Sequence, residues 1–142
     1  MHSNGVPYLT IIDNCSSYTV ARELKNESNR EVVSNLREVF AELGPPTSIL
    51  SDNGTVFRSR MFRTLLHEWS IIQQFSCAYR AKGNGIVERV HRTIKRASKR
   101  AGSTIADAVF WFNNTTSQSG SCPYEIVFSA KSKKPGINEA RI

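Results

Sequence analysis

The sequence predicts an α/β fold, in which short apolar strands alternate with amphipathic helices along a chain of 142 residues. Three observations predict it. The N-terminal run at 6–13 is β-branched and apolar, strand-like segments recur at 47–51 and 71–78, and the apolar residues of the intervening segments recur every three or four positions. Hydrophobic residues make up 39% and charged residues 22% of the chain, a composition that excludes wholesale disorder. At this length one domain is expected.

The N-terminal third is expected to form a β-hairpin followed by a helix. Residues 6–13 and 18–24 are rich in β-branched and aromatic side chains and are separated by four turn-forming residues. Ser28 and Glu31 then have the spacing of a capping box, and apolar residues follow at helical spacing. The sequence Gly-Pro-Pro at 44–46 is expected to end this helix.

The rest of the chain is predicted to be mainly helical. Helical spacing of apolar residues predicts helices at 59–69, 86–101, 103–114 and 123–128. The glycines of Gly83-Asn84-Gly85 are expected to break the chain before the second of these helices. Residues 131–142 are predicted to be a basic tail, so that residues 1–130 form the domain.

The net positive charge of the chain, +7, lies in one segment. Between Arg80 and Arg100 there are eight basic residues and one acidic residue, Glu88, while the rest of the chain is neutral. A pI near 9.7 that arises in one segment indicates a binding surface for a polyanion, of which nucleic acid is the commonest. The alternative is a solvated basic helix without a partner.

Several classes of protein are excluded or disfavoured. No apolar run approaches the length needed to span a bilayer, and residues 1–7 do not resemble a secretory signal. The cysteines, at 15, 77 and 122, have no spacing typical of a zinc or redox site, and neither do the three histidines. These observations favour a reducing compartment, the nucleus or the cytoplasm.

Two carboxylates stand out by position. Asp52 follows the predicted strand 47–51 at an Asn-Gly turn, and Glu88 lies in the first turn of the helix that starts at 86. We expect both to face one cleft. Mg²⁺ and Mn²⁺ prefer oxygen ligands and usually take one or two carboxylates each, so this pair suits phosphoryl transfer. The local alternatives are an Asx turn at Asp52 and a favourable charge at a helix N-terminus for Glu88.

The surroundings of these carboxylates, which 35 residues separate, resemble the catalytic core of retroviral and gypsy-type LTR-retrotransposon integrases. The resemblance extends from about residue 6 to residue 129. Four segments carry it: 51–57 (SDNGTVF), 79–89 (YRAKGNGIVER), 113–115 (NNT) and 121–125 (SCPYE).

This resemblance implies an RNase H-like mixed sheet flanked by helices, with Asp52 and Glu88 as catalytic ligands of two Mg²⁺ or Mn²⁺ ions. The implied activity is DNA integration by phosphodiester strand transfer, and the implied partners are DNA and further copies of the chain. At 80–82 this chain has Arg-Ala-Lys where gypsy-type members commonly have His-Pro-Gln, which puts loop-mediated steps in doubt. The residues expected to contact DNA are Arg80, Lys82, Asn84, Arg89, Arg92, Lys95, Arg96 and Lys99.

In the family, the first catalytic aspartate lies on an earlier strand, and residues 6–18 resemble the segment that follows it. Asp13 is therefore expected to accept hydrogen bonds in a turn, and a metal-binding role for it is the less favoured alternative. By this alignment the sheet lacks its first, central strand. We accordingly expect exposed strand edges at both flanks of the gap, poor stability, and no strand transfer by this chain alone.

Two other functions stay open at this point. The chain could be a truncated or domesticated integrase-derived domain that binds DNA or protein without catalysis, or an RNase H-like nuclease of another branch. The aromatic side chains at the end of the predicted helices are expected to be core or dimer-contact residues: Trp69, Phe110, Trp111 and Phe112.

Overall fold

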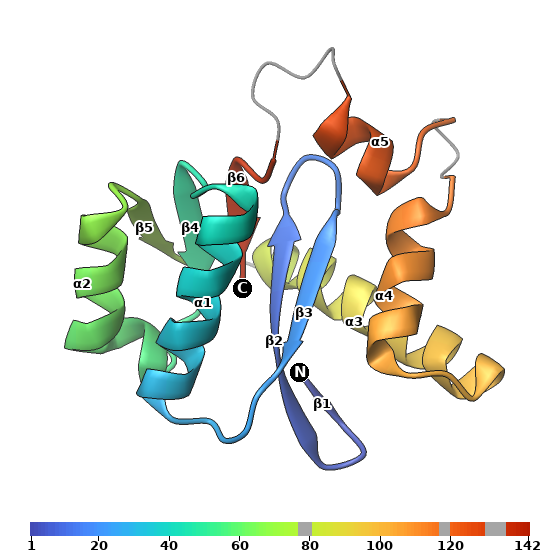
Figure 1. Ribbon diagram of the computed structural model, residues 1–142, viewed down its shortest axis with the longest axis horizontal. Coiled ribbons are helices and arrows are strands. Elements are labelled where there is room, and N and C mark those ends of the chain that lie inside the picture. Colours follow the sequence, from blue (N-terminus) through green and yellow to red (C-terminus); the bar gives the residue numbers. More distant parts are fainter. Residues whose placement is uncertain (77–80, 117–119, 130–135) are drawn as a thin grey trace.

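A computed structural model describes residues 1–76, 81–116, 120–129 and 136–142, with the backbone alone at 81–84. A mixed sheet lies between two layers of helices (Figure 1). The elements in chain order are β1 (His2–Ser3), β2 (Val6–Asp13), β3 (Thr19–Glu23), α1 (Asn29–Leu43), β4 (Ser48–Ser51), the 3₁₀ turn η1 (Val56–Arg58), α2 (Arg60–Glu68), β5 (Ile72–Phe75), α3 (Ala81–Ala101), α4 (Ile105–Asn114), α5 (Pro123–Phe128) and β6 (Glu139–Arg141).

The sheet contains both antiparallel and parallel pairs. Strand β2 is antiparallel to β1, β3 and β6, whereas β4 is parallel to β5 and to β6. The strand order is β1-β2-β6-β4-β5, and β3 pairs with β2. The predicted α/β fold with a mixed sheet flanked by helices is therefore confirmed.

The strand between β2 and β4 comes from the end of the chain. The main-chain N–H of Asn14 donates to the carbonyl of Glu139 at 2.8 Å, and that of Ile142 donates to the carbonyl of Leu50 at 3.0 Å. Two expectations are corrected here: β6 pairs with part of both edges that were expected to be open, and Glu139–Arg141 belong to the sheet instead of a tail. The sequence could not show this, because a three-residue strand has too few positions to display a periodicity.

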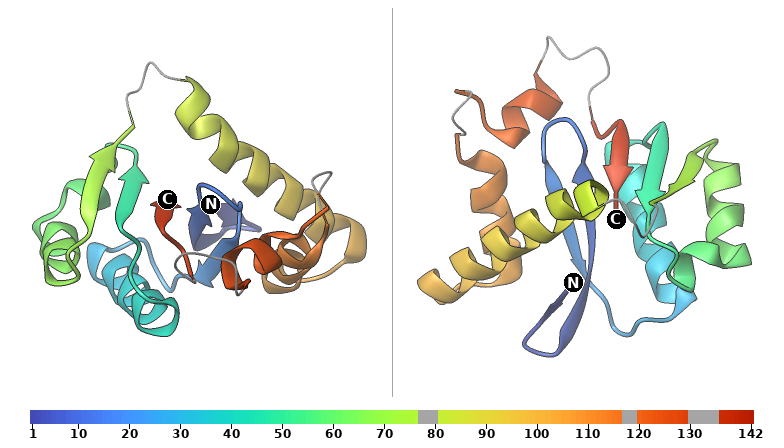
Figure 2. Two further views of the ribbon diagram at one scale, coloured as in Figure 1. Left: turned by 90° about the horizontal axis from the view of Figure 1, so that it is seen from above. Right: turned by 180° about the vertical axis from the view of Figure 1, so that it is seen from behind.

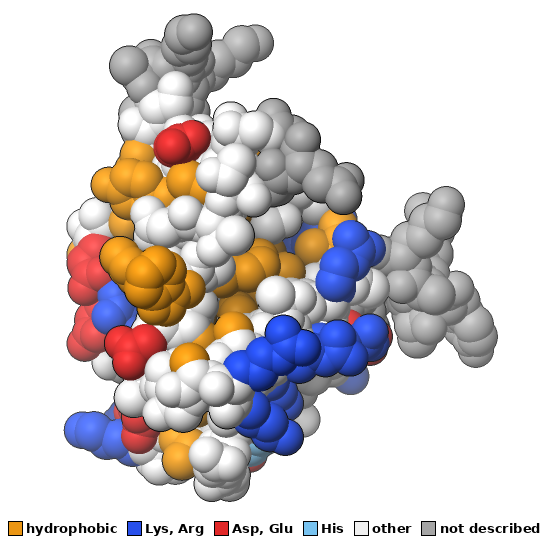
Figure 3. All heavy atoms as spheres, turned by 90° about the vertical axis from the view of Figure 1, so that its right-hand side faces the viewer, with side chains coloured by type: hydrophobic (Ala, Val, Ile, Leu, Met, Phe, Trp, Pro, Cys, Tyr) orange, Lys and Arg blue, Asp and Glu red, His pale blue; other side chains and the backbone are white. Residues whose placement is uncertain are grey.

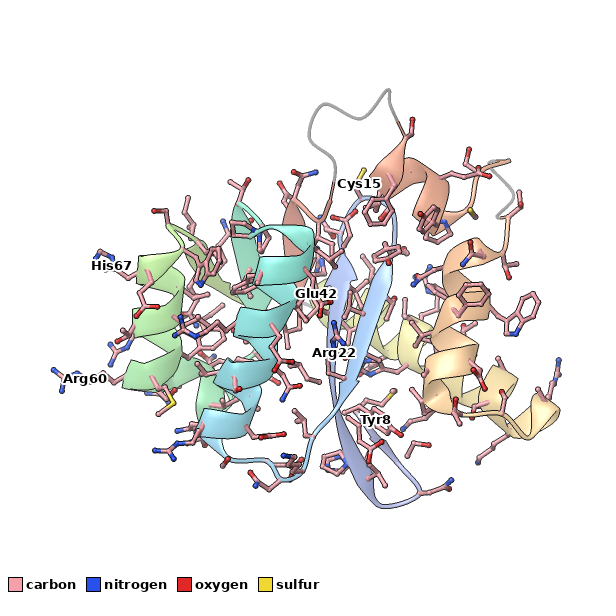
Figure 4. All side chains as sticks on the ribbon, viewed as in Figure 1. Tyr8, Cys15, Arg22, Glu42, Arg60 and His67 are labelled. Atoms are coloured by element: carbon pink, nitrogen blue, oxygen red, sulfur yellow. The ribbon has the colours of Figure 1, made fainter. Side chains whose placement is uncertain are left out.

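One hydrophobic core lies between the sheet and the helices α1 and α2, on the side of the sheet opposite α3 (Figure 2). At the start of α1 only one half of the predicted capping box is present: the Glu31 main-chain N–H donates to Ser28 Oγ at 3.2 Å, but the Ser28 N–H donates to Asn26 Oδ1 and not to Glu31. Figure 4 shows Arg22 of β3 and Glu42 of α1 pointing toward one another, and they form an ion pair. The buried members from the helices are Val32, Val33, Leu36, Val39, Phe40, Phe62, Leu65 and Leu66.

A second core lies on the other face of the β2–β3 hairpin. Because side chains alternate along a strand, Leu9 and Ile11 of β2 join the first core, while Tyr8 and Ile12 face α3 and α4. The buried Asn113 of α4 bonds to both main-chain groups of Thr19, at 2.9 and 2.8 Å. The remaining buried members of this core are Val90, Ile94, Ile105, Ala108 and Val109. This packing fixes α3 against the hairpin.

Some predicted boundaries and burials need correction. Helix α3 begins at Ala81, so Gly83-Asn84-Gly85 lies inside the helix instead of breaking it. Glycine costs a helix about 1 kcal/mol relative to alanine, and no proline follows in this segment to forbid helical backbone. Phe110 and Trp111 are 60% and 65% exposed, which makes the core interpretation wrong for both, whereas Trp69 packs edge-on against Phe40.

Candidate metal and nucleic-acid site

Asp52 lies directly after the last residue of β4, at the end of the sheet. Its side chain is exposed, and its Oδ1 accepts a hydrogen bond from the main-chain N–H of Gly54 at 2.7 Å. A Cβ at position 54 would lie 2.8 Å from the same oxygen, so a larger residue there would displace the carboxylate. The Asx turn expected as the local alternative is present, and it holds the carboxylate at the strand end.

Next to Asp52 is a cavity of about 310 Å³ that lies between the sheet and α3. Val87 and His91 line it from α3, and Tyr8 and Thr10 line it from β2. The remaining lining includes Val56, Phe57 and the C-terminal Ile142. The end of β4 and the first half of α3 therefore face one space, although they are far apart in the sequence.

Glu88 follows Val87 on α3, and its side chain is exposed. Among the residues that line the cavity, Asp52 and Glu27 are the acids, so Glu88 lies beside the cavity and not in its wall. Asp52 lines this cavity, and the expectation that Glu88 faces the same cleft stays a prediction.

The oxygen donors of Asp52 and Glu88 have the chemistry that Mg²⁺ and Mn²⁺ prefer. Within the described ranges, no group of three or more His, Cys, Asp or Glu side chains could hold a metal ion. Magnesium commonly takes one or two carboxylates and completes its shell with water or phosphate, so the two side chains suit a single ion. The described part of the chain does not contain the full ligand set of a two-metal centre.

His91 connects α3 to the sheet. Its Nε2 lies 2.7 Å from the hydroxyl of Thr10, a residue that faces α3 because it alternates with Leu9 and Ile11. Burial, followed by the nearby positive charges of the amino terminus and Lys95, lowers the pKa of His91 to about 4. The ring is therefore neutral at pH 7. One weak signal of this contact is visible in the sequence: Thr10 is a single polar residue within an otherwise apolar stretch.

The basic residues of α3 form an exposed band. Figure 3 shows Lys and Arg side chains gathered on the face that carries α3, and none of the ion pairs found among the described residues involves this helix. The apolar side of the helix, with Val90 and Ile94, is buried. We define the α3 basic face as Arg89, Arg92, Lys95, Arg96, Lys99 and Arg100.

A second hollow, of about 400 Å³, adjoins the far end of this face. Lys95 and Lys99 line it together with Ser98 and Ser103, and the hairpin β1–β2 closes it through His2, Ser3 and Asn4. Ammonium, hydroxyl and amide groups are all donors that bind phosphate oxygens. The sequence did not indicate this hollow, because the N-terminal hairpin that closes it is 90 residues away from α3.

Asp13 lies in the turn between β2 and β3. It is buried, and its Oδ2 accepts hydrogen bonds from the main-chain N–H and the hydroxyl of Ser16, at 2.9 and 2.7 Å. Its Oδ1 accepts a longer bond, 3.4 Å, from the N–H of Asn138. These contacts confirm the turn interpretation, and Asp13 does not line the cavity beside Asp52.

Three residues expected to contact DNA cannot be placed. Arg80 lies outside the described residues, and Lys82 and Asn84 belong to the first turns of α3, where the backbone alone is described. The part of the chain that the structure describes contains no helix long and apolar enough to cross a membrane.

Comparison with known sequences identifies relatives of this chain. Residues 2–81 match the family model described as "Integrase core domain". The Pol polyprotein of feline endogenous virus ECE1 is 33% identical over 138 residues, which cover 89% of this chain and 13% of the polyprotein. That of Radiation murine leukemia virus (strain Kaplan) is 31% identical over 139 residues, or 89% of this chain and 24% of the polyprotein. The chain therefore spans a quarter or less of these curated relatives.

Solved structures share the fold. The catalytic core domain of BIV integrase aligns with a TM-score of 0.75 and 22% identity, covering 89% of this chain and 88% of that chain. The HTLV-2 integrase catalytic core domain in complex with magnesium, in a dimeric form, aligns with a TM-score of 0.71 and 22% identity at the same coverages. A simian T-cell lymphotropic virus intasome chain aligns with a TM-score of 0.75 and 20% identity, covering 94% of this chain and 55% of that chain.

These structures confirm the fold that the sequence resemblance implied. Since the family model matches more than half of the chain, the protein belongs to the integrase core domain family.

Proposed function

We propose that this chain is a DNA-binding integrase core that serves DNA integration, with Asp52 and Glu88 as ligands of Mg²⁺ or Mn²⁺. The observation that carries the proposal is the position of Asp52: it lies at the end of β4 and lines the same cavity as Val87 and His91 of α3, the helix that carries the α3 basic face. A carboxylate beside a cationic surface suits a phosphodiester, whose phosphate a metal ion and basic side chains can bind together.

Each group has a separate task in this proposal. A divalent ion, when bound, supplies Lewis acidity at the phosphate. Asp52, held by its bond to Gly54, and Glu88 supply oxygen ligands. Arg92 and Lys95 bind backbone phosphates along the helix, which orients DNA without reading its sequence.

We propose further that the chain alone does not catalyse strand transfer. Two carboxylates hold two metal ions poorly, and among the described residues no group of three or more His, Cys, Asp or Glu side chains could hold a metal ion. This favours DNA binding without chemistry as the activity of the isolated chain. A domesticated or truncated copy that binds DNA without catalysis fits the same observation.

The proposed partner rests on the aligned structures, and the proposed location rests on the spacing of the cysteines in the sequence. One aligned structure is described as a dimeric form and another as an intasome, and the exposed Phe110 and Trp111 of α4 offer an apolar contact for a second copy. We therefore propose a homo-oligomer on DNA, acting in the nucleus or the cytoplasm.

The first experiment is a Mn²⁺ titration followed by electron paramagnetic resonance. The unmodified chain should bind Mn²⁺, and Asp52→Asn and Glu88→Gln should each weaken binding about tenfold or more, because each removes a charged ligand. Glu38→Gln, which changes an exposed carboxylate on α1, is the matched control and should leave the affinity unchanged. Equal affinities for all four proteins would exclude the metal assignment.

The second experiment is a strand-transfer assay with a recessed 3′ end of DNA and Mn²⁺. We expect no product from the isolated chain. Product formation that Asp52→Asn abolishes would show that the chain is an active enzyme by itself. If Asp13→Asn abolished it as well, the turn interpretation of Asp13 would be insufficient and a ligand role would have to be added.

A further inference from the structure

The hydrogen-bonded sheet is continuous through β6. Among the described strands, β2 pairs with β1, β3 and β6, and β4 pairs with β5 and β6. Every hydrogen-bonded path from β2 to β4 therefore passes through Glu139–Arg141. The hairpin side of the sheet carries α3 with Glu88, and the other side carries Asp52. The main-chain link between the side with Asp52 and the side with Glu88 is therefore β6, which acts beside the packing of Leu9 and Ile11 against Ile49 in the first core.

The turn after β2 holds β6 from one side. Asn14 donates from its main-chain N–H to the Glu139 carbonyl at 2.8 Å, and from Nδ2 to Glu139 Oε2 at 3.3 Å. Its Oδ1 accepts a hydrogen bond from Nε of Arg141 at 2.6 Å. On the other side of β6, the Thr47 N–H donates to the carbonyl of Asn138 at 2.6 Å. These contacts give β6 a defined register.

The slot between β2 and β4 is nevertheless only partly filled. On the edge of β2 that faces away from β3, β6 pairs with Ile12 and Asp13, and β1 pairs with Val6 and Pro7. On this edge no described strand pairs with residues 9–11. The cavity of about 310 Å³ lies there, with Thr10 and Ile142 in its wall. By comparison, β3 pairs with five residues of β2.

The residues of β6 also contribute little buried surface. Ala140 is buried in the first core, but alanine has the smallest side chain of any residue except glycine. Glu139 is exposed. Segments with few hydrogen bonds and few buried contacts open at a lower free energy than the whole domain. We therefore expect β6 to detach more readily than β3.

The entry into β6 is constrained at one residue. Gly136 has φ +100°, a backbone conformation that side chains oppose, and a Cβ there would lie 2.8 Å from the Leu43 carbonyl oxygen. Replacing this glycine should weaken the seating of β6 while leaving the residues of the metal and DNA sites unchanged.

We propose that β6 is a displaceable latch: while seated it joins the two halves of the sheet and holds Asp52 in a fixed position relative to Glu88, and when released it lets them move apart. The C-terminal segment thereby controls metal binding at a site to which it contributes no ligand. The second half of this proposal rests on the proposed metal function, whereas the opening of the latch does not.

Hydrogen exchange tests the opening. The amides of Asn14, Thr47 and Ile142, which bond to or belong to the C-terminal segment, should exchange together and about tenfold or more faster than those of Asp13 and Leu24, which bond within the hairpin. Exchange of all five at the rate of global unfolding would overturn the latch.

A disulfide lock and a release variant test the control of metal binding. Ser48 and Glu139 are register partners and line the same small cavity, so Ser48→Cys with Glu139→Cys can be bridged. Reduction of the same protein is the matched control. Gly136→Ala releases the latch, and Gly102→Ala, also at positive φ but with open space around it, is its control.

We expect the oxidised lock to bind Mn²⁺ about three- to tenfold more tightly than its reduced form, and Gly136→Ala to bind more weakly than Gly102→Ala, since a preorganised pair of ligands loses less freedom on binding. Equal affinities of the locked and reduced forms, with exchange at Ile142 slowed by the lock, would show that β6 opens without controlling the metal. Absence of Mn²⁺ binding in every form, the unmodified chain included, would refute the proposed metal function and this control with it, while the exchange result would still decide the opening.

Discussion

The imidazole of His91 illustrates how one side chain joins two elements that are distant in the sequence. Thr10 and His91 are 81 residues apart, yet their side chains are 2.7 Å apart at Thr10 Oγ1 and His91 Nε2. Because the ring is partly buried near Lys95 and the amino terminus, its pKa falls to about 4. The folded protein therefore disfavours the protonated ring, and acid should destabilise the fold at this position.

We predict that stability falls as the pH is lowered from 6.5 toward 4. In the unfolded chain His91 takes up a proton near its ordinary pKa of 6.5, whereas the folded chain resists protonation until about pH 4, so protons favour the unfolded state across this window. Urea unfolding at pH 7 and pH 4.5 measures this. His91→Gln should show a smaller fall of the urea midpoint between these two pH values than the unmodified chain, and an equal fall in both proteins would contradict the assignment.

Gly54 controls the carboxylate of Asp52. We predict that Gly54→Ala lowers Mn²⁺ affinity several-fold, because the new Cβ would lie 2.8 Å from Asp52 Oδ1 and displace the carboxylate. Since the displaced atom is the end of a side chain, stability should change by no more than about 1 kcal/mol. Gly85→Ala, with open space around its Cβ, is the control and should keep the affinity. Unchanged Mn²⁺ binding in Gly54→Ala would mean that Asp52 reaches the metal from another position.

Helix α3 has two different sides. Val90 and Ile94 pack on β2 and α4, and the opposite side carries the α3 basic face. An amphipathic helix of this kind is held by its apolar side, so its charges remain free to bind a polyanion. Helix α3 thus packs in the second core with one side and offers the other side for DNA binding.

We predict that Arg92→Ala with Lys95→Ala lowers DNA affinity about tenfold or more and reduces the dependence of log Kd on log salt by about one to two, because two phosphate contacts are lost. Fluorescence anisotropy at several salt concentrations measures both quantities. Arg60→Ala with Arg63→Ala removes the same charge from α2, across the sheet from α3, where Arg60 points away from the protein (Figure 4). The proposal that DNA binds the α3 basic face would be contradicted if the α3 double variant had an unchanged salt dependence. It would also be contradicted if the α2 double variant reduced the salt dependence equally.

In the molecule as a whole, two hydrophobic cores share one hairpin. Odd-numbered residues of β2 contribute to the core under α1 and α2, and even-numbered residues contribute to the core under α3 and α4. Ile137 and Ala140 bring the C-terminal segment into the first core. Folding of one half therefore supports the other, and β6 pairs with part of both strand edges that were expected to be exposed.

We predict that Leu36→Ala and Ile94→Ala each lower the free energy of unfolding by about 2 to 4 kcal/mol, since both side chains are fully buried, one in each core. Urea unfolding measures the loss, and Ser34→Ala, exposed on α1, should change it by less than about 0.5 kcal/mol. If Ile94→Ala had no effect on stability, α3 would not be part of the folded core.

The elements with strong local patterns could be predicted from the sequence. The helix at 29–43 has a serine N-cap, a clear apolar period and a glycine at its end, and the hairpin strands are β-branched. The short sequence motifs around Asp52 and Glu88, which resemble those of the family, identified both carboxylates. The start of α3 was predicted wrongly because glycine weakens a helix without excluding it.

The sequence by itself determined the fold class, the family, the basic helix and the turn role of Asp13, because each depends on neighbouring residues or on a short motif. The tertiary structure decided which strand lies between β2 and β4, the pairing of Thr10 with His91, the hollow beside Lys95 and the exposure of Trp111. The physical reason is that main-chain hydrogen bonding in a sheet is indifferent to sequence separation. An unpaired strand edge is satisfied by any extended segment that the chain can bring to it.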